Sequence, residues 1–379
     1  MVILHYFFWG QKSLILFQVT PDLKTNFLGL MKTYIIKQTI SIVLFTVVLL
    51  SLGCKKTLTG PAQDIPGRRD YVWSVDTLNY PYNTISRIWG SSPTDVWVVS
   101  RGGDLDKTIF HFDGNRWKTD GISRPISPSA IWGFANDNIF IGGGNGKIWN
   151  NNGGGWHENA VLTKDGSTQI VFDGMWGDLP NDLFAFGAYP DSNGAANNSV
   201  IANYTDKWTM LNTDNIKGII EHLYKNKIDG KTYLQAINIG GWAHPDSTIL
   251  YEYSHSEFTK IYSSVWSNDF AGDISLINGE VYFVLGKRIA KRIGNEFTTL
   301  LNIENTNFYN AIWGRNSKDI FLRMTDGLAH YNGSDVEYLL HFDKPRTPIF
   351  GAALFEKEVF FIVYEAQTNL NIIYHGVLK

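Results

Sequence analysis

The sequence has a single cysteine, Cys54, and no excess of charge of either sign. One cysteine excludes a disulfide framework and a zinc site built from thiolates. The 33 Lys and Arg are offset by 36 Asp and Glu, whereas a nucleic-acid-binding protein normally carries a basic excess. The nine His are scattered, without the paired spacing of a zinc site. We therefore expect no nucleic-acid partner, no metal and no cofactor.

Aromatic residues and glycine are abundant instead. The 379 residues include 13 Trp, 18 Tyr and 23 Phe, and this aromatic content argues against a disordered chain. The 36 Gly indicate many tight turns between short strands. The composition predicts a large all-β protein.

The first part of the chain is typical of a targeting segment. Lys32 and Lys37 precede an apolar run of 13 residues, Ile40 to Leu52, which is short for a membrane-spanning helix. The ending at Gly53 and Cys54 resembles a bacterial lipobox, which implies cleavage before Cys54 and attachment of lipid to its sulfur. An ordinary signal peptide or a buried segment remains the alternative.

Four ranges divide the chain. Residues 31–53 are the expected lipoprotein signal peptide, and residues 1–30 either are not translated or belong to the leader. Residues 54–69 are the expected lipid-anchored tether, and residues 70–379 the folded domain. Lys55 and Lys56 stand where an inner-membrane retention signal would place Asp, so we expect an outer-membrane lipoprotein in the cell envelope of a Gram-negative-type bacterium.

A repeat organises the chain after residue 70. The stretch from Ile88 to Trp97 (IWGSSPTDVW) returns with Trp-Gly at 132–133, 176–177 and 313–314. In each copy a second apolar pair begins seven residues after the Trp. The first steps are 43 and 44 residues, and the 137 residues from Trp176 to Trp313 hold three units of about 46. Each unit has four short strands, and we expect the fourth strands to contain Trp117, Trp156, Trp208, Phe258, Phe297 and Tyr338.

The two ends of the domain together supply the strands of one blade. The last unit stops at a third strand, Ile372 to Lys379, and the missing fourth strand is Tyr71 to Val75. Such pairing closes a β-propeller and hides its sheet edges. The sequence predicts an all-β, seven-bladed β-propeller of four-stranded antiparallel blades, closed by the N-terminal strand, with six or eight blades as alternatives.

Local patterns in the domain give four further predictions. Residues 214–228 place Ile216, Ile219, Ile220 and Leu223 at helical spacing, which predicts a short helix before the fourth blade. The Asp-Gly pairs at 113–114 and 173–174 and Asn-Gly at 332–333 indicate turns. Trp89, Trp132, Trp176 and Trp313 are expected to pack between blades, and Asp95, Asn138, Asp182 and Asp319 to bond the backbone of their turns.

The repeat also resembles a known group. The stretch Ile88 to Trp97, followed by His111 to Trp117 (HFDGNRW), is similar to the repeats of bacterial extracytoplasmic β-propeller lipoproteins. This resemblance implies the fold and an envelope location. It implies no reaction, because one fold hosts unrelated functions.

Function should lie in loops that do not repeat. Loops between second and third strands meet at one mouth of a propeller channel, where exposed aromatic and charged residues suit a glycan or peptide. The candidate ligand-binding residues are Arg101, Asp104, Asp106, Tyr189, Asp191, Trp242, His244 and Asp246.

Three functions remain open. The first is a lipid-anchored binding or scaffold module for a protein or glycan. The second is a carbohydrate-active enzyme, a glycosidase or a glucosyl-transferase-like protein, that uses carboxylates of these loops. Against a glucosyl-transferase, the sequence has neither the βαβ pattern nor the Gly-rich turn of nucleotide-binding folds. The third is a sensor or assembly component of an envelope complex.

Overall fold

The structure, a computed structural model, describes residues 7–8, 11–12, 66–78, 84–239, 247–265, 271–344 and 346–379. The chain divides into two compact units, Met1–Ile65 and Pro66–Lys379. In the first unit, β1 (Phe7–Phe8) pairs antiparallel with β2 (Gln11–Lys12). Among the described residues, no helix is both long and apolar enough to span a bilayer.

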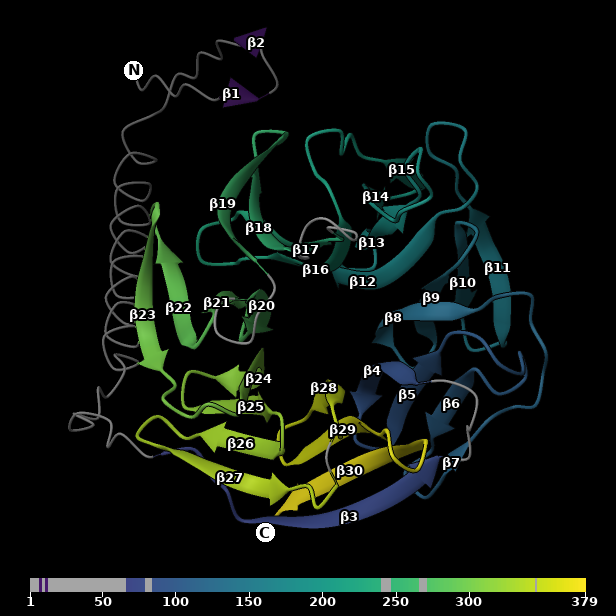
Figure 1. Ribbon diagram of the computed structural model, residues 1–379. Coiled ribbons are helices and arrows are strands. Elements are labelled where there is room, and N and C mark those ends of the chain that lie inside the picture. Colours follow the sequence, from purple (N-terminus) through teal and green to yellow (C-terminus); the bar gives the residue numbers. More distant parts are fainter. Residues whose placement is uncertain are drawn as a thin grey trace, which may run out of the picture. The chain divides into compact units, whose positions relative to one another are not determined.

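The second unit is a ring of seven four-stranded sheets, which confirms the predicted propeller (Figure 1). Each of six blades follows the chain outward from the channel. Blade one contains β4 (Ile85–Ser92), β5 (Asp95–Ser100), β6 (Ile109–Phe112) and β7 (Trp117–Lys118). Blade two contains β8 (Pro128–Ala135), β9 (Asn138–Gly143), β10 (Lys147–Asn151) and β11 (Trp156–Val161). Blade three contains β12 (Val171–Leu179), β13 (Asp182–Tyr189), β14 (Asn198–Tyr204) and β15 (Trp208–Met210).

The weaker repeats form blades four and five, which are as regular as blade six with its Trp313. Blade four contains β16 (Ile219–Lys225), β17 (Thr232–Asn238), β18 (Ser247–Ser254) and β19 (Glu257–Val265). Blade five contains β20 (Gly272–Ile277), β21 (Glu280–Leu285), β22 (Arg288–Ile293) and β23 (Glu296–Asn302). Blade six contains β24 (Phe308–Asn316), β25 (Asp319–Met324), β26 (Gly327–Tyr331) and β27 (Val336–His341). All six aromatic residues predicted for the fourth strands lie in those strands.

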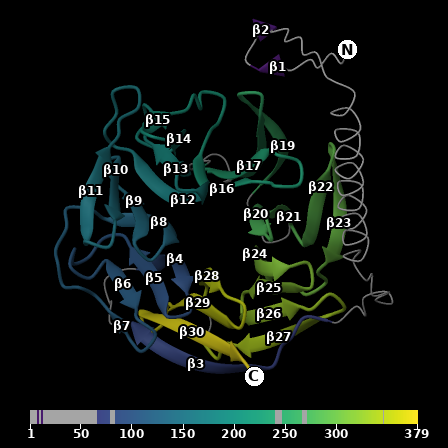
Figure 2. The same cartoon turned by 180° about the vertical axis from the view of Figure 1, so that it is seen from behind.

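Blade seven closes the ring. It contains β28 (Ile349–Leu354), β29 (Glu358–Glu365) and β30 (Leu370–Leu378), and its fourth strand is β3 (Tyr71–Leu78) from the other end of the domain. The register pairs Tyr71 with Leu378 and Leu78 with Asn371. The view from behind shows β3 and β30 side by side at the perimeter (Figure 2).

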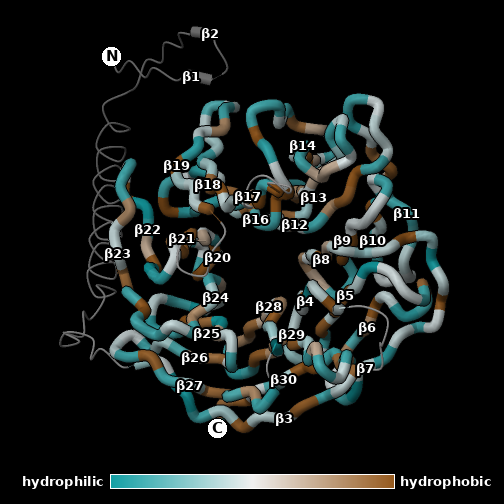
Figure 3. The backbone as a smooth tube through the Cα atoms, viewed as in Figure 1, coloured by the Kyte–Doolittle hydropathy of each residue, from teal (hydrophilic) through white to brown (hydrophobic). Residues whose placement is uncertain are grey.

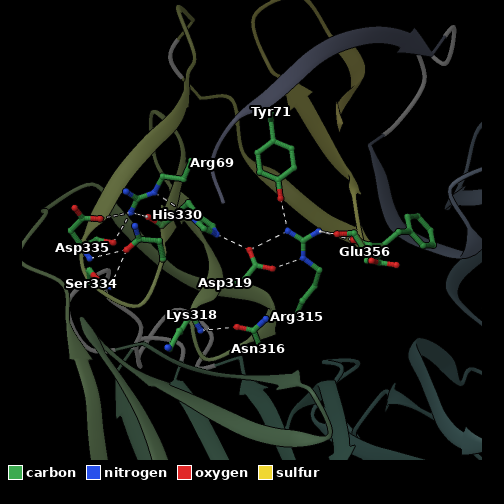
Figure 4. Close-up of polar contacts among 12 residues, drawn as sticks. Arg69, Tyr71, Arg315, Asn316, Lys318, Asp319, His330, Ser334, Asp335 and Glu356 are labelled. Atoms are coloured by element: carbon green, nitrogen blue, oxygen red, sulfur yellow. Dashed lines mark hydrogen bonds and ion pairs between the residues drawn. The ribbon is translucent and has the colours of Figure 1, made fainter. Parts of the chain in front are cut away.

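A polar network holds this closing strand against blade six (Figure 4). His330, fully buried, donates from Nε2 to Asp319 (2.7 Å) and accepts at Nδ1 from Arg69 Nε (3.3 Å). Arg315 donates to both Asp319 and the Tyr71 hydroxyl. The backbone nitrogen of Gly67 donates to Asn332 O (2.8 Å). The end of the expected tether, residues 66–69, therefore contacts the ring.

The core lies between neighbouring sheets. Seven clusters of buried apolar side chains fill the spaces between blades of the described ring. Hydrophobic residues follow the strands and hydrophilic residues gather in the connections at the perimeter (Figure 3). This arrangement is expected when both faces of every sheet are covered.

The predicted tryptophan packing is confirmed. The ring centroid of Trp132 lies 6.4 Å from that of Trp176, and Trp176 lies 5.9 Å from Tyr224 of blade four. Trp132 also donates from Nε1 to Gly177 O in blade three (3.0 Å). Trp313 lies 5.8 Å from Phe361 of blade seven. Each Trp therefore reaches across to the next blade.

The helix expected within residues 214–228 is wrong. Residues 219–225 form β16, the inner strand of blade four, and the pairing register shifts between Ile220 and His222. The extra residue of this β-bulge puts the two buried side chains, Ile220 and Leu223, three positions apart. That spacing imitates one turn of a helix.

Asp173-Gly174 is not a turn either. Both residues lie inside β12, where the register shifts between Phe172 and Gly174. The pairs at 113–114 and 332–333 do lie in turns, because the Asp113 and Asn332 side chains accept hydrogen bonds from the backbone two and three residues on.

Two of the four repeated turn residues, Asp95 and Asp319, have a different role from the one expected. Asp95 accepts hydrogen bonds from the side chains of His111 (2.7 Å), Trp97 (2.9 Å) and Ser91. Asp319 accepts from His330 in the same way. These carboxylates therefore join the second strand to the third, rather than bonding the backbone of the turn before them.

Candidate functional site

A cavity of about 500 Å³ opens where the first strands of the blades begin and the second strands end. We call it the central cavity. It is the mouth at which the loops between second and third strands also lie. Its wall comes from blades one, four, five, six and seven, and includes Arg87, Arg101, Glu221, His222, Gln235, Asp273, Tyr309 and Arg323.

β-Bulges at the start of the first strands build much of this wall. The register shifts fall at Ser86 in β4, at Glu221 in β16, across residues 309–311 in β24 and at Phe350 in β28. All of these residues line the central cavity. A bulge turns a side chain away from the regular alternation, and here it places polar residues on the channel side of otherwise apolar strands.

Arg87 crosses the channel. Its Nη2 donates to Glu221 of blade four (2.9 Å) and its Nε donates to the backbone oxygen of Asp173 in blade three (3.0 Å). Neither blade is a neighbour of blade one in the ring. The ion pair is half-buried and fixes the guanidinium in the wall of the cavity.

Arg101 pairs with Asp173. Burial raises the pKa of Asp173 to about 6, against the opposing effect of Arg101 and with a contribution from the nearby charge of Glu221. The Asp173 side chain is only 7% exposed, whereas that of Arg101 is 50% exposed. Arg101 therefore covers the carboxylate and itself faces the cavity.

His222 and Asp273 form a second pair. His222 Nε2 lies 3.6 Å from Asp273 Oδ1, which also accepts a hydrogen bond from the backbone nitrogen of Ile274 (2.7 Å). Burial raises the pKa of Asp273, with His222 acting in the opposite direction.

Two wall groups lack partners within the described part of the chain. Gln235 is 4% exposed, and its Oε1 has no hydrogen-bond donor there. Arg323 forms no ion pair with a carboxylate there, although the charge of Asp273 acts on it, and its Cζ lies 4.6 Å from the centre of the Tyr309 ring. Burial lowers the pKa of Arg323.

The predicted loop residues are dispersed. Arg101 lines the central cavity. Asp104, in the same loop, is exposed and accepts from Lys107 Nζ (3.0 Å), while Asp106 is half-buried. These two aspartates are not among the residues that line the cavity.

Tyr189 and Asp191 belong to blade three. The Tyr189 hydroxyl donates to Asp165 (2.7 Å), and its ring lines a separate pocket of about 240 Å³. Asp191 Oδ1 accepts from the backbone nitrogens of Asn193 (2.8 Å) and Ala195 (3.1 Å), and these bonds hold its pKa below the usual value. Asp191 thus organises its own loop, and it lies in a different blade from Asp104.

Four predicted residues lie outside the described residues. They are Trp242, His244 and Asp246 of the loop in blade four, and the lipidation residue Cys54. The described residues contain no group of three or more His, Cys, Asp or Glu placed to hold a metal ion.

Sequence reasoning missed Arg87, Glu221, Asp273 and Arg323. The available signal is a charged residue within a first or second strand, such as Arg87 two positions before Trp89. A channel-facing charge and a solvent-facing charge look the same in one sequence, because both interrupt an apolar run.

A second cavity, of about 330 Å³, lies farther along the channel. Trp89, Trp132, Trp176 and Trp313 all contribute to its wall, with Phe355. Tyr224, Ser275 and Trp313 line both cavities, so the two are adjacent. The channel therefore changes from charged to aromatic along its length.

The chain is thus a seven-bladed β-propeller with a charged cavity at one mouth of its channel. No protein-family model and no curated protein matches the sequence. Solved propellers match the fold.

YCF48 bound to D1 peptide has a TM-score of 0.60 and 12% identity, over 83% of this chain and 100% of that chain. YCF48 from Cyanidioschyzon merolae has a TM-score of 0.52 and 12% identity, over 79% and 98%. The WD40 β-propeller domain of Doa1 has a TM-score of 0.55 and 9% identity, over 81% and 97%. Identities this low show the fold alone.

Proposed function

We propose that this protein is a binding module that holds an extended polypeptide segment in the central cavity. The observation that carries the proposal is a cavity wall with hydrogen-bonding capacity that the described residues leave unused. Gln235 Oε1 is an acceptor without a donor, and Arg323 is a donor without a carboxylate partner among the described residues. Buried polar groups normally have hydrogen-bond partners, so the unpartnered Gln235 Oε1 in a cavity wall indicates a ligand.

A polypeptide suits this wall. Each peptide unit offers one N–H and one C=O, which complement an amide oxygen and a guanidinium. The volume of about 500 Å³ lies within the range of known ligand sites. The solved YCF48 propeller of the same fold has a D1 peptide bound, which supports a peptide ligand by analogy of fold.

Selection from a random-peptide library displayed on phage, with the purified full-length protein as bait, tests this function. The affinity of selected peptides is then measured by calorimetry. Ser86→Trp places a large side chain in the cavity wall, and Thr259→Trp places the same side chain on the exposed outer strand β19.

We expect Ser86→Trp to weaken binding at least about 10-fold and Thr259→Trp to leave it unchanged. Equal binding by both variants would place the ligand elsewhere and contradict the proposal. Failure of any peptide to bind, with retention on a glycan array, would contradict it as well.

We also propose that the module is anchored in the cell envelope by lipid on Cys54, as an outer-membrane lipoprotein. The charged, apolar and Gly-Cys segments from Met31 to Cys54 support this proposal. Metabolic labelling with an alkyne-bearing palmitate in a bacterial host should label the wild-type protein and not Cys54→Ser. Labelling of both, or of neither, would show that Cys54 is not lipidated.

A further inference from the structure

Arg323 lies near the end of β25, and its side chain lines the central cavity. It packs over Tyr309, which lines the same cavity. A guanidinium over an aromatic face keeps its edge N–H groups available, because the ring occupies only the face. The stacked ring therefore orients Arg323 without using its hydrogen-bond donors.

The other cavity arginines are neutralised. Arg87 pairs with Glu221 and Arg101 pairs with Asp173. Arg323 has no carboxylate within ion-pair distance among the residues that the structure describes. A desolvated charge without a partner is destabilising, and proteins retain such groups mainly where a ligand completes them.

Asp273 does not fill this role. Its Oδ1 is engaged by the Ile274 backbone nitrogen and faces His222 at 3.6 Å. Asp273 and Arg323 attract each other as opposite charges, but they lie beyond ion-pair distance. Glu221, the other acidic group in the wall, is held by Arg87.

We propose that Arg323 is the anchor for a carboxylate of the bound polypeptide, and this inference rests on the proposed function. A planar guanidinium binds a carboxylate through two parallel N–H···O bonds. The carboxylate belongs either to an acidic side chain or to a chain terminus, and both sources share this chemistry. The ligand is accordingly acidic at the position that reaches Arg323.

Three short peptides distinguish a side-chain carboxylate from the carboxylate of a chain terminus. One alternates glycine and glutamate and is blocked at both ends. The second replaces glutamate with glutamine and is also blocked, and the third is the glutamine peptide with a free carboxyl terminus. Calorimetry on the full-length protein at low and raised salt measures their affinities. Tighter binding of the first peptide identifies a side-chain carboxylate, and tighter binding of the third identifies a terminus.

Arg323→Gln should weaken binding of the preferred acidic peptide about 10- to 100-fold, because a hydrogen-bonded charge pair is lost. Arg323→Lys, which keeps the charge and loses the bidentate geometry, should give an intermediate loss. Arg116→Gln removes the same charge from the exposed turn before β7 and should bind as the wild type does.

Unfolding in urea provides an independent readout. Arg323→Gln should leave the midpoint unchanged or raise it, because a half-buried charge without an ion-pair partner is removed. A clearly lower midpoint would show that Arg323 is already satisfied within the protein and would overturn the proposal. Equal binding of all three peptides would also overturn it.

The library-selected peptides distinguish this failure from failure of the function. If Ser86→Trp blocks those peptides and Arg323→Gln does not affect them, the cavity binds polypeptide and the carboxylate anchor is wrong. If no selected peptide binds the wild type, the proposed function is wrong, and the proposed role of Arg323 is then wrong as well.

Discussion

Asp173 and Asp319 are both buried aspartates beside an arginine, yet their pKa values move in opposite directions. Burial raises the pKa of Asp173 to about 6, and Arg101 offsets this only in part. Burial would also raise the pKa of Asp319, but the hydrogen bonds from His330 and Arg315 outweigh it and hold the pKa below its usual value. At Asp319 the donors outweigh burial, whereas at Asp173 burial and the like charge of Glu221 outweigh Arg101.

The raised pKa of Asp173 gives a pH dependence that can be measured. An unfolded aspartate titrates near about 3.9, below the folded value of about 6. The folded state therefore binds the extra proton, and the stabilisation is present at low pH and is lost as the pH rises through about 6. Asp173→Asn should remove this loss. The free energy of unfolding of Asp173→Asn minus that of the wild type should therefore increase by about 1–3 kcal/mol between about pH 4 and pH 7.

Urea unfolding across this pH range tests the expectation. Asp137→Asn, in the exposed turn between β8 and β9, is the matched control and should run parallel to the wild type. A parallel profile for Asp173→Asn would show that Asp173 does not titrate in this range.

At the scale of elements, the glycine of each Trp-Gly pair makes room for a side chain of the preceding blade. A Cβ at Gly133 would lie 2.6 Å from the Trp89 ring, and one at Gly177 would lie 2.9 Å from Phe134. The same holds at Gly90 against Phe355 (2.9 Å) and at Gly314 against Ile277 (3.0 Å). The repeat thus encodes contact between blades as well as the strands within each blade.

Gly133→Ala should therefore destabilise the ring. The added methyl group would overlap a ring packed between two sheets, and overpacking of this kind costs about 1–3 kcal/mol. Gly144→Ala is the control, because no atom lies within 4 Å of a Cβ there. Thermal unfolding of both variants measures the difference, and equal midpoints would mean that Trp89 moves aside freely.

At the scale of the whole molecule, one strand pair joins the two ends of the ring. β3 and β30 pair along their whole lengths, and Val72 faces Val377 in the register. Both side chains are exposed, at 54% and 37%. Opposed residues on adjacent strands have Cα atoms about 4.5–5.5 Å apart, within the range of a disulfide.

Val72→Cys with Val377→Cys, in a Cys54→Ser background, should form a disulfide that latches the ring. The loop it closes is long, so the oxidised protein should gain about 2–5 kcal/mol over its reduced form. Val72→Cys with Val265→Cys, on the outer strand of blade four, should form no bond within one molecule. Thiol titration and chemical unfolding provide the measurements. Failure of the first pair to oxidise would contradict the closure.

Two of the wrong predictions have the same physical source. Residues 214–228 suggested a helix and Asp173-Gly174 a turn, and each is the site of a β-bulge in a first strand. A bulge inserts one residue and breaks the alternation of period two on which strand prediction depends. The same bulges place Glu221 in the cavity wall and Asp173 beside the cavity residue Arg101, so the positions that misled the prediction help to build the site.

The repeat pattern was enough to predict seven blades of four strands, closed by the N-terminal strand. This was possible because each blade is a local pattern repeated along the chain, from Trp89 to Trp313, and repetition makes a weak signal strong. The site, in contrast, became visible only in the folded ring. Arg87 and Glu221 are 134 residues apart and meet across the channel because the ring closes, and such a contact leaves no periodic trace in the chain.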